Sequence, residues 1–404
     1  MTPPLILTEG DAAQAVELSA GEANALNALG IAAVTPRIGD GLFDVAAGTK
    51  IGAVTVGDRQ VVVRPKITDI NRLIFMLGYA RNPQIWRDDP IGVESNDDLL
   101  PAIAEAFVRI AGRAVERGLL HGYRTVSEAL PVLRGRMRAG EQMSRRFGFP
   151  VPISVEYDDF TVDIAENQLL AMATLRLLKV PRISVSARLG LQRLRHTLME
   201  ATVPLRGTPK PRWQPSRLNA RYQGALQLAE VVISAESFEN LLGDLRVTGL
   251  LFDMCVIFED FVTVAMSESF NRFGWQCESQ APLHLDDQRS VRMRADLLCR
   301  KGREPVAVID AKYKAEKPAG FPNADLYQML AYCTVLGLAE GHLIYAKGNE
   351  EGRVHTVRNA GITIHCKALD LGLKPAALLK RVDQLAKSIV LANASSMPAV
   401  VRGA

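Results

Sequence analysis

The sequence is organised around Val306–Lys314, which reads VAVIDAKYK. Small and β-branched apolar residues in such a run are typical of a buried strand, in which alternate side chains share one face of the sheet. Asp310 and Lys312 would therefore point the same way, about 6 to 7 Å apart along the strand. Burying a carboxylate and an ammonium is costly unless they meet a metal, a substrate or each other. The pair therefore indicates a functional site that binds a metal or a substrate. The alternative interpretation is a plain ion pair on an edge strand.

The segment just upstream, Ser290–Cys299, alternates polar and apolar residues and contains Asp296 among apolar neighbours. If the two runs pair as a hairpin around a turn at Gly302, Asp296 lies near Asp310. Two carboxylates and Lys312 then meet at one place. Such hard oxygen ligands suit Mg²⁺, which keeps several waters and takes phosphate oxygens of a substrate. The predicted substrate is therefore a phosphodiester.

Asp296 followed by Asp310-Ala311-Lys312 resembles the D...(D/E)xK signature of the PD-(D/E)XK nucleases. The upstream flank adds to the resemblance, because Gly249–Phe261 is expected to form a helix that carries Glu259, placed like the first-helix acid of that fold. The resemblance implies a C-terminal nuclease core with a mixed sheet flanked by helices.

The downstream flank adds a second element. Asn323 is expected to cap a helix that holds Gln328 and Tyr332, which are i and i+4 on one face and resemble the QxxxY element of RecB-like nucleases. His342–Lys347 is expected to form a further strand. The resemblance implies that Asp296, Asp310 and the Ala311 carbonyl hold one or two Mg²⁺ ions. It also implies that Glu259, Lys312, Gln328 and Tyr332 complete the catalytic site.

The rest of the chain is predicted to form two further regions of a mixed α/β protein. Residues 1–95 contain short β-like runs separated by Gly, Asp and Thr clusters, which predicts a β-rich N-terminal domain. Residues 96–245 are expected to be mainly helical and basic, and residues 246–404 to form the nuclease domain. Within residues 170–229, eleven basic residues, Arg182 and Arg206 among them, accompany a single acid, Glu200. This stretch fits phosphate binding, an acidic protein partner or a solvated face.

Three upstream motifs narrow the resemblance to one family. They are Val62–Ile67, Leu133–Arg136, and Phe160–Asp163 with Asn167. In this order, and with the C-terminal motifs, they resemble the McrC family, the nuclease subunits of McrBC modification-dependent restriction systems. The resemblance implies a partner, an McrB-like AAA+ GTPase ring that recognises DNA containing modified cytosine. The N-terminal and middle regions would engage this ring, and the chain would stimulate its GTP hydrolysis.

Composition limits the remaining possibilities. The hydrophobic share of 48% and charged share of 23% are those of a globular protein. No Gly-Lys dipeptide occurs, which excludes a Walker A loop, so GTP is expected to bind to the partner. The five cysteines are spaced singly and are expected to be reduced thiols. Without a long apolar stretch or an N-terminal signal, the expectation is a cytoplasmic protein with no membrane partner.

Two rival functions remain open. One is a free-standing RecB-like DNA repair nuclease without a GTPase partner. The other is a non-catalytic regulator of an AAA+ ring, against which the intact Asp296, Asp310 and Lys312 argue.

Overall fold

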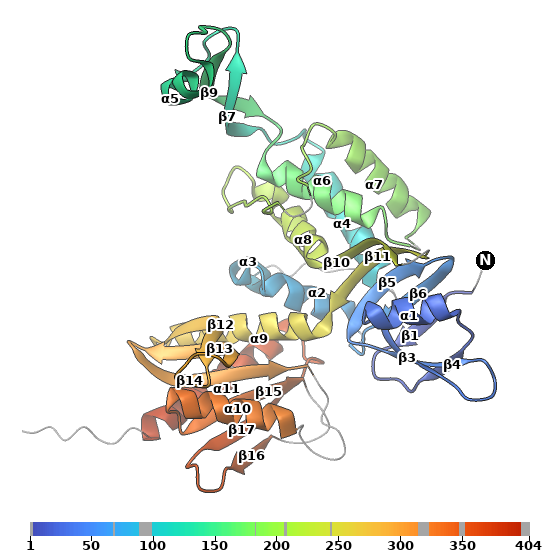
Figure 1. The fold of residues 1–404 in the computed structure, drawn as a ribbon, viewed down its shortest axis with the longest axis vertical. Coiled ribbons are helices and arrows are strands. Elements are labelled where there is room, and N and C mark those ends of the chain that lie inside the picture. Colours follow the sequence, from blue (N-terminus) through green and yellow to red (C-terminus); the bar gives the residue numbers. More distant parts are fainter. Residues whose placement is uncertain are drawn as a thin grey trace, which may run out of the picture.

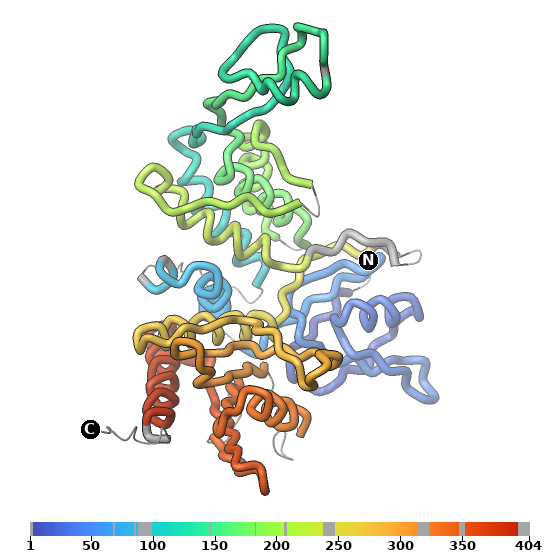
Figure 2. Tube along the Cα trace, turned by 60° about the vertical axis from the view of Figure 1, so that its left-hand side comes forward, coloured from blue at the N-terminus to red at the C-terminus, as the bar shows by residue number. Residues whose placement is uncertain are grey.

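The computed structural model describes residues 3–67, 69–88, 99–181, 183–205, 208–242, 245–313, 323–346 and 352–396. It is a mixed α/β protein, as predicted, with several sheets (Figure 1). The N-terminal strands lie beside a helical region with a projecting lobe, and the C-terminal sheet lies below the helical region and beside the N-terminal strands (Figures 1 and 2). The predicted boundary at residues 95 and 96 lies outside the described residues, as do Arg182, Arg206, Lys314 and Lys347.

The N-terminal region contains two sheets. The larger has the strand order β1-β6-β5-β11-β10, with β1 parallel to β6 and the other pairs antiparallel. Its strands are β1 (Leu5–Thr8), β5 (Lys50–Val56), β6 (Arg59–Arg64), β10 (Glu236–Leu242) and β11 (Leu245–Asp253). The smaller sheet has β4 (Phe43–Ala47) between β2 (Gln14–Val16) and β3 (Ala32–Pro36). Helix α1 (Ala20–Ala28) begins with a capping box between Ser19 and Glu22.

The predicted helix over Gly249–Phe261 is wrong in its first part. Gly249–Asp253 belongs to β11, which pairs with β5, and the helix α9 begins only at Met254 and ends at Asn271. Leu250, Leu251 and Phe252 are all buried. Because the run is apolar on both faces, its hydrophobic pattern does not distinguish a strand from a helix. A Cβ at Gly249 would lie 2.4 Å from the Ala53 carbonyl oxygen, so glycine permits this close strand pairing.

The middle region is helical in part. Helices α2 (Ile70–Tyr79) and α3 (Pro83–Asp88) precede a bundle of α4 (Leu99–Val115), α6 (Ala165–Leu177), α7 (Val185–Thr197) and α8 (Gln223–Ser234), preceded by the short η1 (Ala220–Tyr222). The projecting lobe interrupts this bundle (Figure 1). It is a sheet of β7 (Gly122–Leu130), β9 (Ile153–Thr161) and β8 (Arg136–Met137), in the order β7-β9-β8, with helix α5 (Ala139–Arg146).

The C-terminal region is one sheet between helices. Its order is β12-β13-β14-β15-β17-β16, with parallel pairs at β14-β15 and β15-β17 and antiparallel pairs elsewhere. The strands are β12 (Gln276–His284), β13 (Arg292–Lys301), β14 (Glu304–Lys312), β15 (Glu340–Ala346), β16 (Arg353–Thr356) and β17 (Thr363–Leu369). Helix α10 (Asn323–Leu336) packs on β14 and β15, whereas α9 packs on β12, β13 and β14 and on α11 (Pro375–Ser396).

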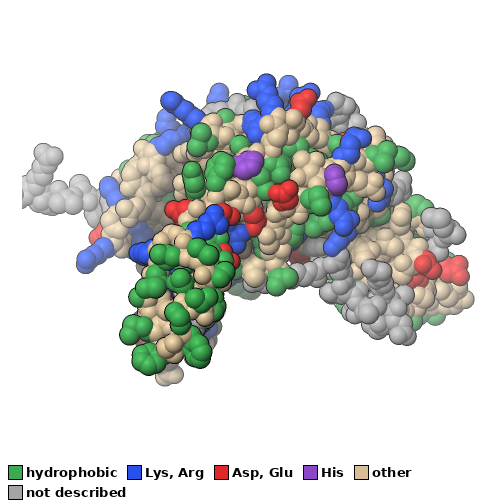
Figure 3. All heavy atoms as spheres, turned by 90° about the horizontal axis from the view of Figure 1, so that it is seen from above, with side chains coloured by type: hydrophobic (Ala, Val, Ile, Leu, Met, Phe, Trp, Pro, Cys, Tyr) green, Lys and Arg blue, Asp and Glu red, His purple; other side chains and the backbone are tan. Residues whose placement is uncertain are grey.

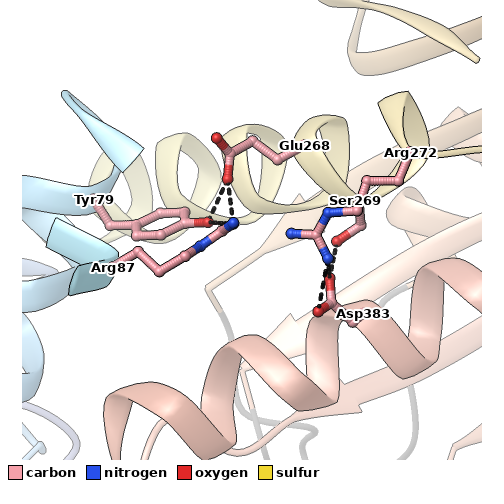
Figure 4. A network of polar contacts seen from close by, with 6 residues as sticks. All are labelled: Tyr79, Arg87, Glu268, Ser269, Arg272 and Asp383. Atoms are coloured by element: carbon pink, nitrogen blue, oxygen red, sulfur yellow. Dashed lines mark hydrogen bonds and ion pairs between the residues drawn. The ribbon is translucent and has the colours of Figure 1, made fainter. Parts of the chain in front are cut away.

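Polar contacts on α9 connect the regions (Figure 4). Glu268 accepts hydrogen bonds of 2.6 Å from Tyr79 on α2 and from Arg87 on α3. Asp383 on α11 accepts hydrogen bonds from Ser269, the residue after Glu268, and from Arg272, one turn beyond Glu268 on α9. Helix α9 is therefore tied to α2 and α3 on one side and to α11 on the other.

The expectation that all five cysteines are reduced thiols is wrong for two of them. Cys277 on β12 and Cys299 on β13 form a disulfide, while Cys255, Cys333 and Cys366 are free. The two bonded residues are direct partners in the antiparallel register. Sequence spacing could not indicate this pair, because only the strand register brings the two side chains together.

Candidate active site

The predicted hairpin is present and sets the position of the acidic residues. Leu297 of β13 pairs with Ile309 of β14, so Asp296 lies level with Asp310. The main-chain N–H of Ala311 donates a 2.8 Å hydrogen bond to Oδ2 of Asp296. Because β14 lies between β13 and β15, Asp310 is on a central strand and only 1% exposed. The pair therefore does not lie on an edge strand, and that part of the alternative interpretation is wrong.

Asp310 and Lys312 form a close buried pair. The Lys312 Nζ lies 2.5 Å from Oδ2 of Asp310. Burial, and then the nearby charge of Asp296, raise the pKa of Asp310 to about 7. Burial alone would lower the pKa of Lys312, but the carboxylate of Asp310 outweighs it, so this pKa is raised. The lysine is the cation that offsets the burial of two acids.

Helix α10 extends the cluster through a chain of hydrogen bonds. Lys312 Nζ donates to Oε1 of Gln328 at 3.1 Å, and Nε2 of Gln328 donates to the Tyr332 hydroxyl at 2.7 Å. The Tyr332 hydroxyl in turn donates to the main-chain carbonyl of Arg294 at 2.5 Å. The chain therefore runs from β14 to α10 and back to β13, which fixes the direction of the lysine.

The position of α10 follows from its packing. Met329, Tyr332 and Cys333 are buried on its sheet-facing side. A Cβ at Gly341 of β15 would lie 2.6 Å from the sulfur atoms of Met329 and Cys333, so glycine lets the helix approach the sheet. The i, i+4 spacing then aims Gln328 at the carboxyl end of β14.

Glu259 reaches the same cluster from α9. Burial, the nearby charges of Asp260 and Asp310 and a hydrogen bond shared with Asp296 act on this carboxyl, and the net effect is a raised pKa. The pKa of Asp296 is also raised, first by burial. The structure thus brings together all six side chains predicted for the site, from α9, β13, β14 and α10.

Gln280 is a member of the cluster that sequence reasoning missed. Its Nε2 donates a hydrogen bond to Oε1 of Glu259 and lies 3.4 Å from Oδ1 of Asp296. Gln280 has φ of 54°, a left-handed conformation that is uncommon for a residue other than glycine within a strand. A glutamine in an alternating strand gives no sequence signal of this role, because the pairing of β12 with β13 is what places it opposite Asp296.

The surroundings of Asp310 test whether the acidic cluster could hold a magnesium ion. Oδ1 of the buried Asp310 has no hydrogen-bond partner within the described part of the chain, whereas Oδ2 lies 2.5 Å from Lys312 Nζ. In those same residues, no three His, Cys, Asp or Glu side chains already form a metal cage. Mg²⁺ does not require one, because it is usually bound by one or two carboxylates together with waters and substrate phosphates.

Comparisons with known proteins agree with this architecture. Residues 45–346 match the family model of the McrBC 5-methylcytosine restriction system component. The chain belongs to this family, so the family predicted from the motifs is confirmed. No curated protein matches the sequence. In the described residues, no helix is both long and apolar enough to cross a membrane.

Two solved structures of Thermococcus gammatolerans proteins are similar to the chain. One is a refined half-complex from a tetradecameric assembly of McrB AAA+ hexamers with bound McrC. The sequence identity is 17% and the TM-score is 0.58, and the alignment covers 96% of this chain and 100% of that chain. The other is a cryo-EM structure of the McrBC complex. Its sequence identity is 17% and its TM-score is 0.39, and the alignment covers 66% of this chain and 88% of that chain. The first likeness extends over nearly the whole fold.

Proposed function

We propose that the chain is the DNA endonuclease subunit of a two-component, NTP-dependent, modification-dependent restriction system. One observation carries the proposal: the buried Asp310 lies on a central strand between Asp296 and Lys312. A buried cluster with more acids than bases is costly for folding alone. Membership of a restriction-system family and the order of α9, β12–β14, α10 and β15 support a PD-(D/E)XK core.

In this proposal Asp296, Asp310 and the Ala311 carbonyl would hold one or two Mg²⁺ ions. The metal would supply charge stabilisation at the phosphate and a more acidic water. Lys312 positions the attacking water and stabilises developing negative charge, and Gln328 keeps the ammonium directed. Gln280 orients Glu259 toward Asp296. Tyr332 acts through Gln328 and is a positioning residue.

The proposed partner is an McrB-like AAA+ ring that binds GTP. The matched half-complex of T. gammatolerans contains McrB hexamers with bound McrC, and this supports the same pairing here. Recognition of modified cytosine would then belong to the ring. The chain would deliver the cleavage site and stimulate GTP hydrolysis.

The projecting lobe is the part that we propose engages the ring. Its tip exposes a cluster of large apolar side chains, and Figure 3 shows such side chains gathered on the lobe. Phe147 is 82% exposed and Phe149 71%. The others are Val132, Leu133, Met137, Met143 and Val151. Monomeric proteins rarely expose large contiguous apolar patches unless a partner covers them.

The tip is held in place by hydrogen bonds. Gln142 of α5 donates to the Phe149 carbonyl at 2.9 Å, and its Oε1 accepts from the Ser154 N–H at 2.7 Å. Arg136 and Glu156 pair at 2.7 Å across β8 and β9. The apolar side chains are therefore presented by an ordered scaffold, as a docking surface requires.

The test of catalysis is cleavage of methylated and unmethylated plasmid with Mg²⁺, with and without the ring protein and GTP. Asp310→Ala should lower the cleavage rate at least about 100-fold, because electrostatic stabilisation dominates this chemistry. The control variant Asp287→Ala lacks an exposed acid in the turn after β12, and it should cleave DNA at the wild-type rate. Equal cleavage by the Asp310 variant and the wild type would reject the site.

The same assay separates the rival functions. Cleavage that needs Asp310 but neither ring nor nucleotide would favour a free-standing nuclease. Stimulated GTP hydrolysis with no cleavage under any condition would favour a non-catalytic regulator.

The ring contact has its own test. The double variant Phe147→Ser/Phe149→Ser should reduce the stimulation of GTP hydrolysis at least about 10-fold. The reason is that a small number of buried aromatic side chains carry most of the binding energy of an interface. Ile38→Ser/Leu285→Ser changes two other exposed apolar residues and should leave the stimulation intact. Unchanged stimulation in the lobe variant would place the contact elsewhere.

A further inference from the structure

The end of strand β14 is held by an aromatic side chain that has no part in the mechanism proposed above. The strand ends at Lys312, and its last pairing with β15 joins Lys312 to Tyr345. Tyr313 therefore follows the paired part of the strand. Because side chains alternate along a strand, Tyr313 is directed to the face opposite Lys312. The contacts of Tyr313 thus fix the end of β14 from behind the acidic cluster.

Two side chains hold Tyr313, and they come from different regions of the chain. The Tyr313 ring packs against the buried Phe258 of α9, with ring centroids 5.9 Å apart. The Tyr313 hydroxyl donates a 2.9 Å hydrogen bond to Oε2 of Glu9 in the N-terminal region. Phe258 directly precedes Glu259, and Tyr313 directly follows Lys312. Tyr313 is therefore adjacent in the chain to one residue of the site and in contact with the neighbour of another.

Glu9 is itself fixed to the N-terminal sheet. It directly follows β1, and its main-chain N–H donates a 3.0 Å hydrogen bond to the carbonyl of Arg64, the last residue of β6. The main-chain N–H of Lys66 donates to Oε2 of Glu9 at 3.4 Å, the same oxygen that accepts from Tyr313. The Glu9 carboxylate is therefore a fixed acceptor beside the paired strands β1 and β6.

The N-terminal sheet also holds the beginning of α9. Strand β11 belongs to this sheet and runs directly into α9 (Figure 1). At the junction, the Met254 N–H donates a 3.0 Å hydrogen bond to the Thr49 carbonyl. The two elements that carry Glu259 and Lys312 are therefore both attached to the N-terminal sheet, α9 at its first residue and β14 just beyond its last.

We propose that Glu9 is a positioning residue of the nuclease site, which acts through Tyr313 to set the direction of Lys312. The inference rests on the proposed function, because it assigns Glu9 a part in DNA cleavage. Loss of the hydrogen bond leaves the Tyr313 ring against Phe258 but lets the end of β14 rotate, and the ammonium of Lys312 moves with it. The N-terminal sheet is then part of the catalytic unit, in addition to any contact that it makes with the ring.

The experiment measures single-turnover cleavage by the full chain with Mg²⁺, the ring protein, GTP and saturating methylated DNA. Tyr313→Phe removes the donor and keeps the aromatic ring, whereas Glu9→Leu removes the acceptor. Each should slow cleavage about 10-fold, because small displacements of a catalytic group cost rates of this size. The double variant should be no slower than either single variant, since both changes remove the same hydrogen bond. Affinity for DNA without Mg²⁺ and stimulation of GTP hydrolysis should not change.

Two further variants separate positioning from stability. Glu9→Gln keeps a side-chain acceptor for the Tyr313 hydroxyl and should cleave within about 2-fold of the wild-type rate. Tyr79→Phe is the matched control, because it removes another hydrogen bond from a tyrosine to a glutamate, the 2.6 Å bond to Glu268 of α9 (Figure 4). Glu268 lies more than two helical turns beyond Glu259. Tyr79→Phe should therefore lower the thermal unfolding temperature and leave the cleavage rate unchanged.

Three outcomes would overturn the inference. Wild-type cleavage rates in folded Tyr313→Phe and Glu9→Leu would remove the role of Glu9, while Asp310-dependent cleavage would stand. Equal slowing by Glu9→Gln and Glu9→Leu, or by Tyr79→Phe, would show that the loss does not come from this hydrogen bond. If the wild type does not cleave DNA under any of these conditions, the proposed function fails, and the role of Glu9 in cleavage fails with it.

Discussion

The main-chain N–H of Ala311 donates a 2.8 Å hydrogen bond to Oδ2 of Asp296, which ties the two acid-bearing strands together at the level of the site. The bond fixes the rotation of the Asp296 carboxylate. Its other oxygen lies 3.4 Å from Gln280, which also holds Glu259. The acidic residues are therefore oriented before any ligand binds, and such preorganisation is what electrostatic catalysis requires.

The orientation of Lys312 should depend on Gln328. Gln328→Ala leaves Lys312 in contact with Asp310 but removes its 3.1 Å contact to α10. We expect the rate of DNA cleavage to fall about 10- to 100-fold, as small displacements of a catalytic group cost rates of this size. Affinity for DNA, measured without Mg²⁺, should not change. Thr334→Ala, on the same helix, is the control, and a wild-type rate in the Gln328 variant would contradict the role.

Asp163 should make the protein sensitive to acid. Burial alone would raise its pKa, but hydrogen bonds from Gln168 and Thr202 and the charge of Arg124 lower it below the ordinary value of 3.8. A lowered pKa means that the ionised group stabilises the fold above its unfolded-state pKa, and that this contribution is lost as pH falls through the folded-state value. Asp163→Asn should therefore cost about 1.5 to 3 kcal/mol of unfolding free energy at pH 7.

Urea unfolding from pH 3.5 to 8 checks this prediction. The stability difference between wild type and Asp163→Asn should be constant from pH 8 to about 5 and should shrink below about pH 4. Asp58→Asn, at an exposed turn between β5 and β6, is the control for the substitution itself and should leave the stability at pH 7 unchanged. A difference that stays constant down to pH 3.5 would show that Asp163 contributes by packing and not by its charge.

Gly190 should be needed for the contact between α7 and α4. In the interior of a helix, alanine is more stabilising than glycine by about 0.5 to 1 kcal/mol. A Cβ at this position nevertheless meets Val108, and overpacking costs about 1 to 3 kcal/mol. Gly190→Ala is therefore expected to lower the free energy of unfolding. Val108→Ala/Gly190→Ala should be more stable than the sum of the single changes predicts, and strict additivity would mean that the two residues do not interact.

The disulfide predicts a count of reactive thiols. In denaturant without reductant, Cys255, Cys333 and Cys366 should react with a thiol reagent while Cys277 and Cys299 do not. Prior reduction should expose all five. Labelling of five thiols in protein kept under oxidising conditions would show that Cys277 and Cys299 are not bonded to each other.

The positions of the central site residues could be predicted from sequence because they depend on local rules. A strand has a side-chain period of two, so Asp310 and Lys312 had to share a face, and the short turn at Gly302 had to bring Asp296 alongside. The helical period placed Gln328 and Tyr332 on one face of α10. These rules involve residues close in the chain, and the structure follows them.

Contacts between residues distant in the chain were decided only by the tertiary structure. The apolar run Leu250–Phe252 became part of a strand because β5 offered an unpaired edge, although the run alone suits a helix equally well. Gln280 entered the site, and Cys277 met Cys299, through the register of β12 against β13. The sequence by itself determined which side chains alternate on each element. Only the folded chain determined which elements meet, because that choice depends on the burial and pairing of many residues at once.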